Sequence, residues 1–323
     1  MKYRYSQPEK ADRSMSEVSI ESKIKKLRDR LPAAVEMLTE CRVCPRNCQV
    51  NRRSGETGIC GMPAELVIAS ANLHHGEEPP ISGSGGSGTI FLSGCNLSCV
   101  YCQNYPISQF RTGEIYSAAE TAAMMIDLQK RGAHNINFVT PSHYVPSLME
   151  ALLIAYEGGL RIPLVYNSSG YDSIESLKLL EGIIDIYMPD MRYNDSDHAR
   201  RFSGAADYPE INRAVIKEMY RQVGTLQIKK GVAARGLLIR HLVLPENIAG
   251  SSEIFEFIAR EISPETYVAV MSQYFPAHKA CNKVGQDKQS PLARRIRPDE
   301  YDRVLEAFDR AGLKNGFIQP YPD

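Results

Sequence analysis

Short apolar runs alternate with amphipathic stretches along most of this chain. Six of the runs are rich in β-branched and aromatic residues, and their lengths are typical of buried strands. They occupy residues 89–93, 135–139, 163–167, 184–188, 236–243 and 267–272. Strands that alternate with helices indicate βα units and a parallel sheet. The pattern therefore predicts an α/β fold, and six such units favour a partial (β/α)6, TIM-like barrel.

Helix signals lie between these runs. Ser117, with Glu120 three positions later, has the spacing of a capping box, and Gly132 marks the expected end of that helix. A second helical pattern follows the fourth predicted strand. Its apolar face is expected to contain Ile211, Ala214, Val215 and Met219.

Amphipathic helices are also predicted near both ends of the chain. Residues 14–39 combine apolar and charged positions at helical spacing, and Pro32 predicts an interruption that divides them into two helices. The segment that starts at Arg297 opens a last helix that ends near Gly312. This last helix is expected to cover the barrel.

A glycine-rich stretch, residues 82–88, separates the N-terminal part from the strand region. It has the composition of a loop that leads into the first strand. A phosphate-binding loop would also need a lysine followed by serine or threonine, which this stretch lacks. We therefore predict an N-terminal helical, cysteine-rich extension over residues 1–85, and a core with its C-terminal cover over residues 86–323.

Composition narrows the class of protein. Lysine plus arginine and aspartate plus glutamate number 38 each, so the formal net charge is zero and nucleic-acid binding is not supported. A hydrophobic content of 43% in 323 residues is enough for a large core. The chain opens without an apolar signal segment and contains no run of membrane-spanning length. These features predict a cytoplasmic protein without a membrane partner, in which disulfides are rare.

Cys95, Cys99 and Cys102 form a C-x3-C-x2-C motif directly after the first predicted strand. Three thiolates occupy three irons of a [4Fe-4S] cluster and leave the fourth iron open to a ligand that is not protein. Structural zinc needs four protein ligands, and a disulfide would leave one cysteine over, so both alternatives are disfavoured. Reactive groups in parallel barrels lie at the C-terminal ends of strands, where this motif lies.

Four more cysteines, Cys41, Cys44, Cys48 and Cys60, form a C-x2-C-x3-C-x11-C array. Four thiolates make a closed site, which suits structural zinc or an electron-relaying [4Fe-4S] cluster. This second metal site could hold either group, because the spacing does not distinguish zinc from a cluster. The alternative to both is that the four cysteines bind no metal. Cys281 stands alone and is predicted to be an unligated thiol.

Several motifs in a fixed order resemble one family. They are C-P-R-N-C from Cys44, G-C-N-L-S-C-V-Y-C-Q-N from Gly94, Y-M-P-D-M-R-Y from Tyr187 and I-R-H-L-V-L-P from Ile239. Together they resemble the radical S-adenosylmethionine (SAM) proteins related to pyruvate formate-lyase activating enzyme. The resemblance spans nearly the whole chain from Cys41 onward.

The resemblance implies that the amino and carboxylate groups of SAM chelate the open iron. A low-potential electron, supplied by a flavodoxin or ferredoxin, then cleaves SAM to methionine and a 5'-deoxyadenosyl radical, which takes a hydrogen atom from a substrate. The resemblance favours an activase that installs a glycyl radical on a partner enzyme. The motifs do not specify whether the substrate is a protein or a small molecule.

The same resemblance implies a SAM pocket at the strand ends, with Tyr101 near the adenine and Asn104 beside it. Relatives carry G-G-E after the second strand, whereas this chain reads Thr-Pro-Ser-His at 140–143. Thr140, Ser142 and His143 are therefore the expected substitutes. Further candidates at later strand ends are Asn167, Ser168, Ser169, Asp190 and His241 for SAM, with Gln273 and Tyr274 for substrate.

An iron–sulfur or zinc protein that senses metal or redox state without turnover is the alternative function. It is disfavoured because the motif at Cys95 lacks the fourth ligand that a purely structural cluster would have. The two functions differ in whether SAM changes the spectrum of the cluster.

Overall fold

The computed structural model describes residues 2–4, 17–281 and 290–321. Its strands are β1 (Lys2–Arg4), β2 (Leu66–His74), β3 (Ser87–Leu92), β4 (Glu114–Tyr116), β5 (Ile136–Val139), β6 (Leu164–Ser168), β7 (Ile186–Pro189), β8 (Gln227–Lys229), β9 (Val232–Leu242), β10 (Tyr267–Met271) and β11 (Asn315–Ile318). Its α-helices are α1 (Glu17–Glu36), α2 (Pro79–Ser82), α3 (Tyr105–Ser108), α4 (Ala118–Lys130), α5 (Val145–Glu157), α6 (Ile174–Leu179), α7 (Ser196–Ser203), α8 (Tyr208–Val223), α9 (Ser251–Phe257) and α10 (Pro298–Arg310).

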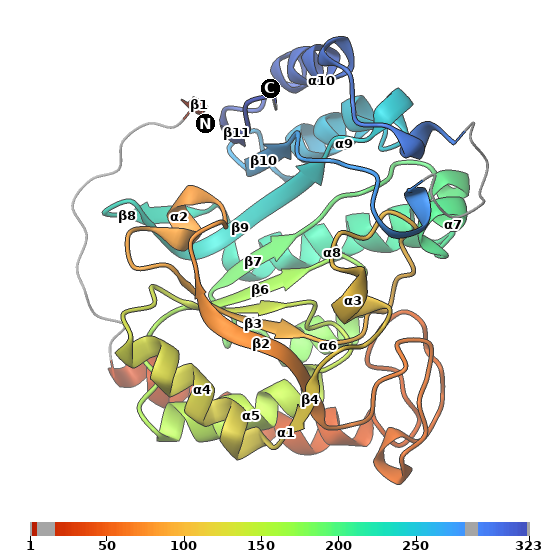
Figure 1. The fold of residues 1–323 in the computed structure, drawn as a ribbon. Coiled ribbons are helices and arrows are strands. Elements are labelled where there is room, and N and C mark those ends of the chain that lie inside the picture. The colour runs from red at the N-terminus through yellow and green to blue at the C-terminus, as the bar shows by residue number, and fades with distance from the viewer. Residues whose placement is uncertain (1, 5–16, 282–289, 322–323) are drawn as a thin grey trace.

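One mixed sheet forms the centre of the molecule (Figure 1). Its strand order is β1-β11-β10-β9-β7-β6-β5-β3-β2-β4, and β8 pairs with β9 beside this path. The six predicted strands correspond to β3, β5, β6, β7, β9 and β10, which pair in parallel and in chain order. The predicted α/β class is confirmed. The closure of these strands into a partial barrel stays a prediction.

The sheet extends beyond the predicted strands at both sides. On one side β2 pairs antiparallel with β3, and β4 pairs antiparallel with β2. On the other side β11 continues the parallel order, and β1 pairs antiparallel with it. Because β2 lies before residue 85 and β3 after it, the sheet crosses the predicted domain boundary.

The helix predictions hold with two corrections. The capping box before α4 is present, with Ser117 N donating to Glu120 Oε2 at 2.8 Å. Helix α10 begins at Pro298 as expected. The interruption at Pro32 is wrong, because α1 runs through this residue as one helix; positions 14–16 of the predicted segment lie outside the described residues. Ala214 is exposed on α8, where Asn212 is buried instead.

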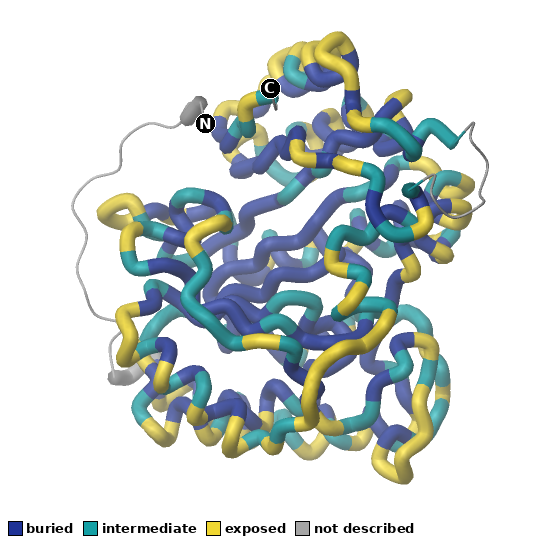
Figure 2. The backbone as a smooth tube through the Cα atoms, in the orientation of Figure 1, coloured by how far each residue is buried: buried dark blue, intermediate teal, exposed yellow. Residues whose placement is uncertain are grey.

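Helices α1, α4 and α5 lie side by side against the sheet, whose central strands β6, β7 and β10 are buried at every position (Figure 2). Burial of apolar side chains between these layers supplies most of the driving force for the fold. One ion pair lies inside the same interface. Lys23 of α1 donates to Asp185 at 2.6 Å and to the Tyr156 hydroxyl of α5 at 3.1 Å. This buried contact fixes α1 on the core.

None of the helices in the described ranges is both long and apolar enough to cross a membrane.

Candidate metal and cofactor site

The C-x3-C-x2-C motif lies on the loop that follows β3, and each of its three sulfurs has a hydrogen-bond partner. Leu97 N donates to Cys95 Sγ at 3.4 Å, and Ser203 Oγ donates to Cys99 Sγ at 2.9 Å. Cys102 Sγ lies 3.1 Å from Ser108 Oγ. Donors of this kind stabilise thiolates and tune the potentials of iron–sulfur clusters. The loop is therefore arranged to hold three sulfurs in their ligating form.

Burial acts against ionisation of these thiols when no metal is bound. Burial raises the pKa of Cys95 to about 12, and Cys99 and Cys102 add to the rise. The pKa of Cys102 is also raised, by burial first and then by Cys99. A metal that binds here must displace the thiol protons. Loading of the site is therefore expected to release protons and to weaken at low pH.

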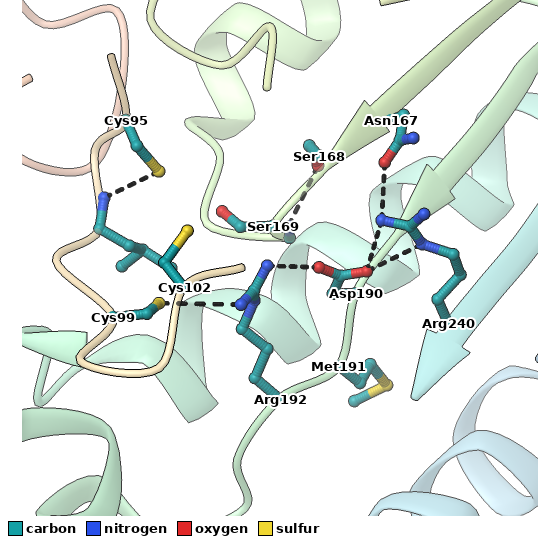
Figure 3. Close-up of polar contacts among 12 residues, drawn as sticks. Cys95, Cys99, Cys102, Asn167, Ser168, Ser169, Asp190, Met191, Arg192 and Arg240 are labelled. Atoms are coloured by element: carbon teal, nitrogen blue, oxygen red, sulfur yellow. Dashed lines mark hydrogen bonds and ion pairs between the residues drawn. The ribbon is translucent and has the colours of Figure 1, made fainter. Parts of the chain in front are cut away.

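Two arginines, Arg192 after β7 and Arg240 on β9, connect the cysteine loop to the ends of the central strands. Arg192 Nη1 lies 3.7 Å from Cys99 Sγ, and its Nη2 donates to Asp190 at 2.5 Å. The other oxygen of Asp190 accepts from Arg240 Nε at 2.9 Å, and Arg240 Nη2 donates to Asn167 Oδ1 at 2.8 Å. Figure 3 shows Arg192 between Cys99 and Asp190, and Asp190 between the two guanidinium groups.

A cavity of about 180 Å³ opens beside these groups. Its lining comes from the cysteine loop and from the C-terminal ends of β7, β9 and β10. The lining residues are Tyr101, Cys102, Gln103, Asn104, Asp190, Arg192, Arg240, Leu242, Met271 and Gln273. The structure thus brings together three residues that the sequence predicts for the SAM pocket, Tyr101, Asn104 and Asp190, and Gln273, which it predicts for substrate.

The candidates at the end of β6 have different surroundings. Asn167 contacts Arg240, as described above. Ser168 is buried, and its hydroxyl donates to Asp172 at 2.7 Å and accepts from Gly170 N at 3.1 Å. Ser169 is buried with no hydrogen-bond partner for its hydroxyl among the described residues. Ser168 therefore supports the loop, whereas Ser169 keeps a free polar atom.

The segment after β5 does not reach the cavity lining. Thr140 has φ of 63°, a left-handed conformation that is rare for a β-branched residue. Ser142 is buried beside Asp172 and Tyr166. His143 is buried, and its Nε2 donates to the Ser93 carbonyl at 3.0 Å. Burial, with Arg52 nearby, lowers the pKa of His143 to about 3, so this ring is neutral.

The structure does not bring His241 to the cavity either. Successive side chains of a strand point to opposite faces, so Arg240 faces the cavity and His241 faces α9. His241 Nδ1 donates to the Met191 carbonyl and its Nε2 accepts from Ser251 Oγ, both at 2.8 Å. Burial lowers the pKa of His241 to about 4. His241 is thus a buried neutral residue with both nitrogens satisfied.

Sequence reasoning missed Arg192 and Arg240. Arg192 lies in the motif that starts at Tyr187, and Arg240 lies in the motif that starts at Ile239. For Arg240, the alternation of side chains along β9 could have indicated which face it shares. Leu238, Arg240 and Leu242 share one strand face, and Leu242 lines the cavity with Arg240.

Comparison with known proteins identifies the family. A family model described as the radical SAM superfamily matches residues 89–223. Uncharacterized protein MJ0674 of Methanocaldococcus jannaschii is 30% identical over 294 residues, which are 87% of this chain and 77% of that protein. The chain belongs to the radical SAM superfamily. Uncharacterized protein MJ0808 of the same organism is 24% identical over 258 residues, 74% of this chain and 71% of that protein.

A solved structure of Streptococcus suis SuiB bound to precursor peptide SuiA was also matched, with a TM-score of 0.48 and 12% identity. The match covers 70% of this chain and 46% of that one, so this chain spans less than half of its length. Similarity at this level carries no functional argument. The closer relation of this radical SAM protein to the activating enzyme stays a prediction.

The residues at the site fit the cofactors that the superfamily implies. Three thiols with donors at their sulfurs suit an iron–sulfur cluster. Arg192 Nε is buried without a hydrogen-bond partner among the described residues, so it is available to an anionic group such as a carboxylate. No three His, Cys, Asp or Glu side chains in the described ranges converge on a single metal ion.

The N-terminal array of this radical SAM protein has similar surroundings. Cys41, Cys44 and Cys60 are buried, and Cys48 is partly buried. Ile59 N donates to Cys48 Sγ at 3.4 Å. Backbone hydrogen bonds from Arg46 and Met62 reach the sulfurs of Cys44 and Cys60.

Burial raises the pKa of Cys44 to about 12. Burial also raises the pKa of Cys60, although the positive charge of Arg52 opposes that rise. These sulfurs are thus surrounded by donors like those of the first motif, in an environment that disfavours free thiolates.

The two cysteine segments are in direct contact. A Cβ on Gly94 would lie 2.3 Å from Met62 Cγ and 3.1 Å from the Cys60 carbonyl. The Asn96 carbonyl accepts from Arg46 Nε at 2.7 Å, and Arg46 lies two residues after Cys44. The array therefore packs against the loop that carries the first motif.

Replacing Gly94 by alanine is expected to destabilise the protein by about 2–4 kcal/mol. Two costs add up in this variant. A residue with a side chain is strained at φ of +77°, and the new Cβ would overlap Met62. The difference in the free energy of unfolding between wild type and variant is measured by urea unfolding. Gly312→Ala is the matched control, because Gly312 has φ of +76° and open space around it, so it should lose only about 1–2 kcal/mol. Equal losses for both variants would contradict the contact between the two segments.

Proposed function

We propose that this protein is a radical SAM enzyme that uses a [4Fe-4S] cluster on Cys95, Cys99 and Cys102. Its function is to cleave SAM reductively and to abstract a hydrogen atom from a substrate. Membership of the superfamily supports the proposal. The observation that carries it further is the cysteine loop, whose three sulfurs have hydrogen-bond partners and whose Cys102 lines a cavity together with Arg192 and Asp190.

In this proposal the residues of the chain bind and orient the cofactors. The three cysteines would hold the cluster, and Arg192 would pair with the SAM carboxylate through its unpartnered Nε. Asp190 keeps Arg192 and Arg240 in place through ion pairs of 2.5 and 2.9 Å. Tyr101 is held by a 2.7 Å hydrogen bond from Tyr193, so its ring presents a fixed apolar wall to the cavity.

When bound, the cluster and SAM supply one electron and a carbon-centred radical, which is chemistry that protein side chains lack. The chain contributes exclusion of water, because the aromatic rings of Tyr101, Tyr193, Tyr208 and Tyr274 pack together behind the cysteine loop. It also holds Cys99 between a serine hydroxyl and a guanidinium group. Both donors favour negative charge on that sulfur.

We further propose that the substrate is a glycyl-radical enzyme, with a flavodoxin or ferredoxin as the electron donor in a cytoplasmic setting. The motif resemblance supports this role, and the cavity described above does not distinguish it from modification of a small molecule. Electron paramagnetic resonance of mixtures with candidate glycyl-radical enzymes tests it. A stable glycyl radical signal is expected. If no candidate gives this signal, the substrate is not a glycyl-radical enzyme and a small molecule or peptide is favoured.

For the N-terminal array we propose a second [4Fe-4S] cluster, with Cys41, Cys44, Cys48 and Cys60 as ligands. Its contact with the first motif, through Met62 beside Gly94 and through the hydrogen bond from Arg46 to the Asn96 carbonyl, supports electron exchange between the two sites. The anaerobically reconstituted protein should contain about eight irons, and Cys44→Ser should lower this to about four. Zinc bound in place of the second set of four irons would contradict the proposal.

The main test of function is SAM cleavage. Anaerobic, reconstituted protein with dithionite and SAM should release 5'-deoxyadenosine, which chromatography detects. Iron that binds without any SAM-dependent product or spectral change would instead favour a metal or redox sensor without turnover. Thus the same sample distinguishes the two functions.

A further inference from the structure

A second, smaller cavity lies next to the one beside the cysteine loop. Its volume is about 50 Å³, and it is lined by Gly76, Glu77, Glu78, Arg240, Ala269, Met271, Gln273, Phe317 and Gln319. Three of these residues, Arg240, Met271 and Gln273, also line the first cavity. The two cavities are thus adjacent around the same side chains. The carboxylates of the second one come from the connection between β2 and α2.

Glu78 is the unusual residue of this second cavity. Its residue exposure is only 8%, and its Oε2 atom is buried without a hydrogen-bond partner among the described residues. A buried carboxyl oxygen without a donor is costly. Burial raises the pKa of Glu78 to about 7, and the positive charge of Arg240 only partly offsets this rise. The free oxygen therefore requires a proton or a positively charged partner.

The neighbouring charged groups do not meet that requirement. Glu77 already has partners, because its Oε1 lies 3.1 Å from His74 Nδ1 and its Oε2 lies 3.8 Å from Arg240 Nη1. Arg240 itself donates to Asp190 and Asn167 at 2.9 and 2.8 Å. Its Nε and Nη2 donors are thus committed to the first cavity, and its Nη1 lies beside Glu77 rather than Glu78. The second cavity presents a carboxylate acceptor for which a ligand can supply the donor.

We propose that Glu78, with Glu77 beside it, binds a primary ammonium group of the substrate. This inference rests on the proposed function, since it places that group next to the cavity assigned to SAM. An ammonium group supplies three donors and one positive charge in the volume of about one water molecule, which fits the small cavity. The rest of the substrate would extend past Met271 and Gln273 toward the cysteine loop. The group that is recognised is therefore a lysine side chain if the substrate is a glycyl-radical enzyme, as proposed above, and an amino group if the substrate is a small molecule.

Binding of a small probe to the full-length protein, without SAM or turnover, tests this inference. In isothermal titration calorimetry at constant ionic strength, n-butylammonium should bind at least about tenfold more tightly than n-butanol or butyrate, because only the first has the charge. N-acetyl-lysine methylamide, which imitates a lysine in a protein, tests whether the ammonium group comes from a protein or from a free amine. Tighter binding than n-butylammonium indicates a lysine of a protein substrate, and weaker binding indicates a free amine.

Glu78→Gln should weaken n-butylammonium binding at least about tenfold, since it removes the negative charge and keeps the shape. Glu210→Gln, on the exposed side of α8, is the matched control and should leave binding unchanged. Equal binding by wild type and Glu78→Gln, or equal binding of n-butylammonium and n-butanol, would overturn the inference.

The pH dependence of the wild type is a second test that needs no variant. The ammonium group binds the ionised carboxylate, so its affinity should rise about tenfold from pH 6 to pH 8 as Glu78 loses its proton. Glu77, Asp190 and Arg240 face the same carboxyl group, and His74 faces Glu77. A flat profile would overturn the inference. It would leave the SAM-cleavage proposal intact, because that reaction is measured separately.

Discussion

Replacing Cys99 by alanine is expected to abolish SAM cleavage. The variant leaves two of three thiols for the cluster, and it removes the sulfur that accepts from Ser203 and lies next to Arg192. A cluster held by two cysteines is not retained. Chromatography of 5'-deoxyadenosine after anaerobic reconstitution should show no product above the background without enzyme, and the iron content should fall by about four per chain.

Cys281→Ala is the matched control for this variant. Cys281 is a free cysteine like Cys99, although it is only partly buried, and it lies one residue beyond Ala280, whose backbone N donates to the Val100 carbonyl in the cysteine loop. The control therefore tests a thiol close to the loop that has no proposed ligand role. It should keep its iron and its SAM cleavage. Retained turnover in Cys99→Ala would show that the cluster assignment is wrong.

Replacing Lys23 by methionine is expected to lower the free energy of unfolding by about 3–5 kcal/mol, measured by urea unfolding followed by circular dichroism. Lys23 is 4% exposed and lies between Asp185 and Tyr156. Its loss leaves Asp185 buried and charged, with the backbone N of Leu164 as a remaining donor. Burial lowers the pKa of Lys23, whereas Asp185 opposes that shift. The pair is thus a coupled buried unit.

Two further variants separate the ion pair from general effects of surface charge. Lys23→Met combined with Asp185→Leu should recover most of the loss, because no uncompensated charge remains. Lys25→Met removes a partner of Asp29 in a pair whose side chains are 79% and 60% exposed, and it should cost less than about 1 kcal/mol. Similar losses for Lys23→Met and Lys25→Met would contradict a buried pair.

The sequence predicted the central strands because their apolar runs are continuous. Strands buried on both faces give this pattern, and β6, β7 and β10 are buried at every position. Strand β2 was missed because only its first three residues are buried. Strand β11 was missed because it is four residues long and contains glycine. Both are held by pairing with neighbours, which local patterns do not reveal.

The candidate site was predictable only where chemistry fixes the spacing along the chain. Cysteine spacing pointed to both of the cysteine groups for which metal sites are predicted. Asp190 was named because it ends a strand, whereas Arg240 was overlooked in favour of His241, its neighbour on the opposite face of β9. The sequence did not single out Glu78, because its unusual environment depends on its burial and on the nearby charge of Arg240, which is distant in the sequence. Tertiary packing created that environment.

The most direct test of the central claim is Mössbauer spectroscopy of protein reconstituted with 57Fe, recorded with and without SAM. Since the first motif supplies three cysteines to four irons, one iron of that cluster should give a distinct signal that changes when SAM binds. Cys44→Ser removes the signal of the second site and should leave this change visible. Spectra that are identical with and without SAM, or a site filled by zinc, would contradict the account.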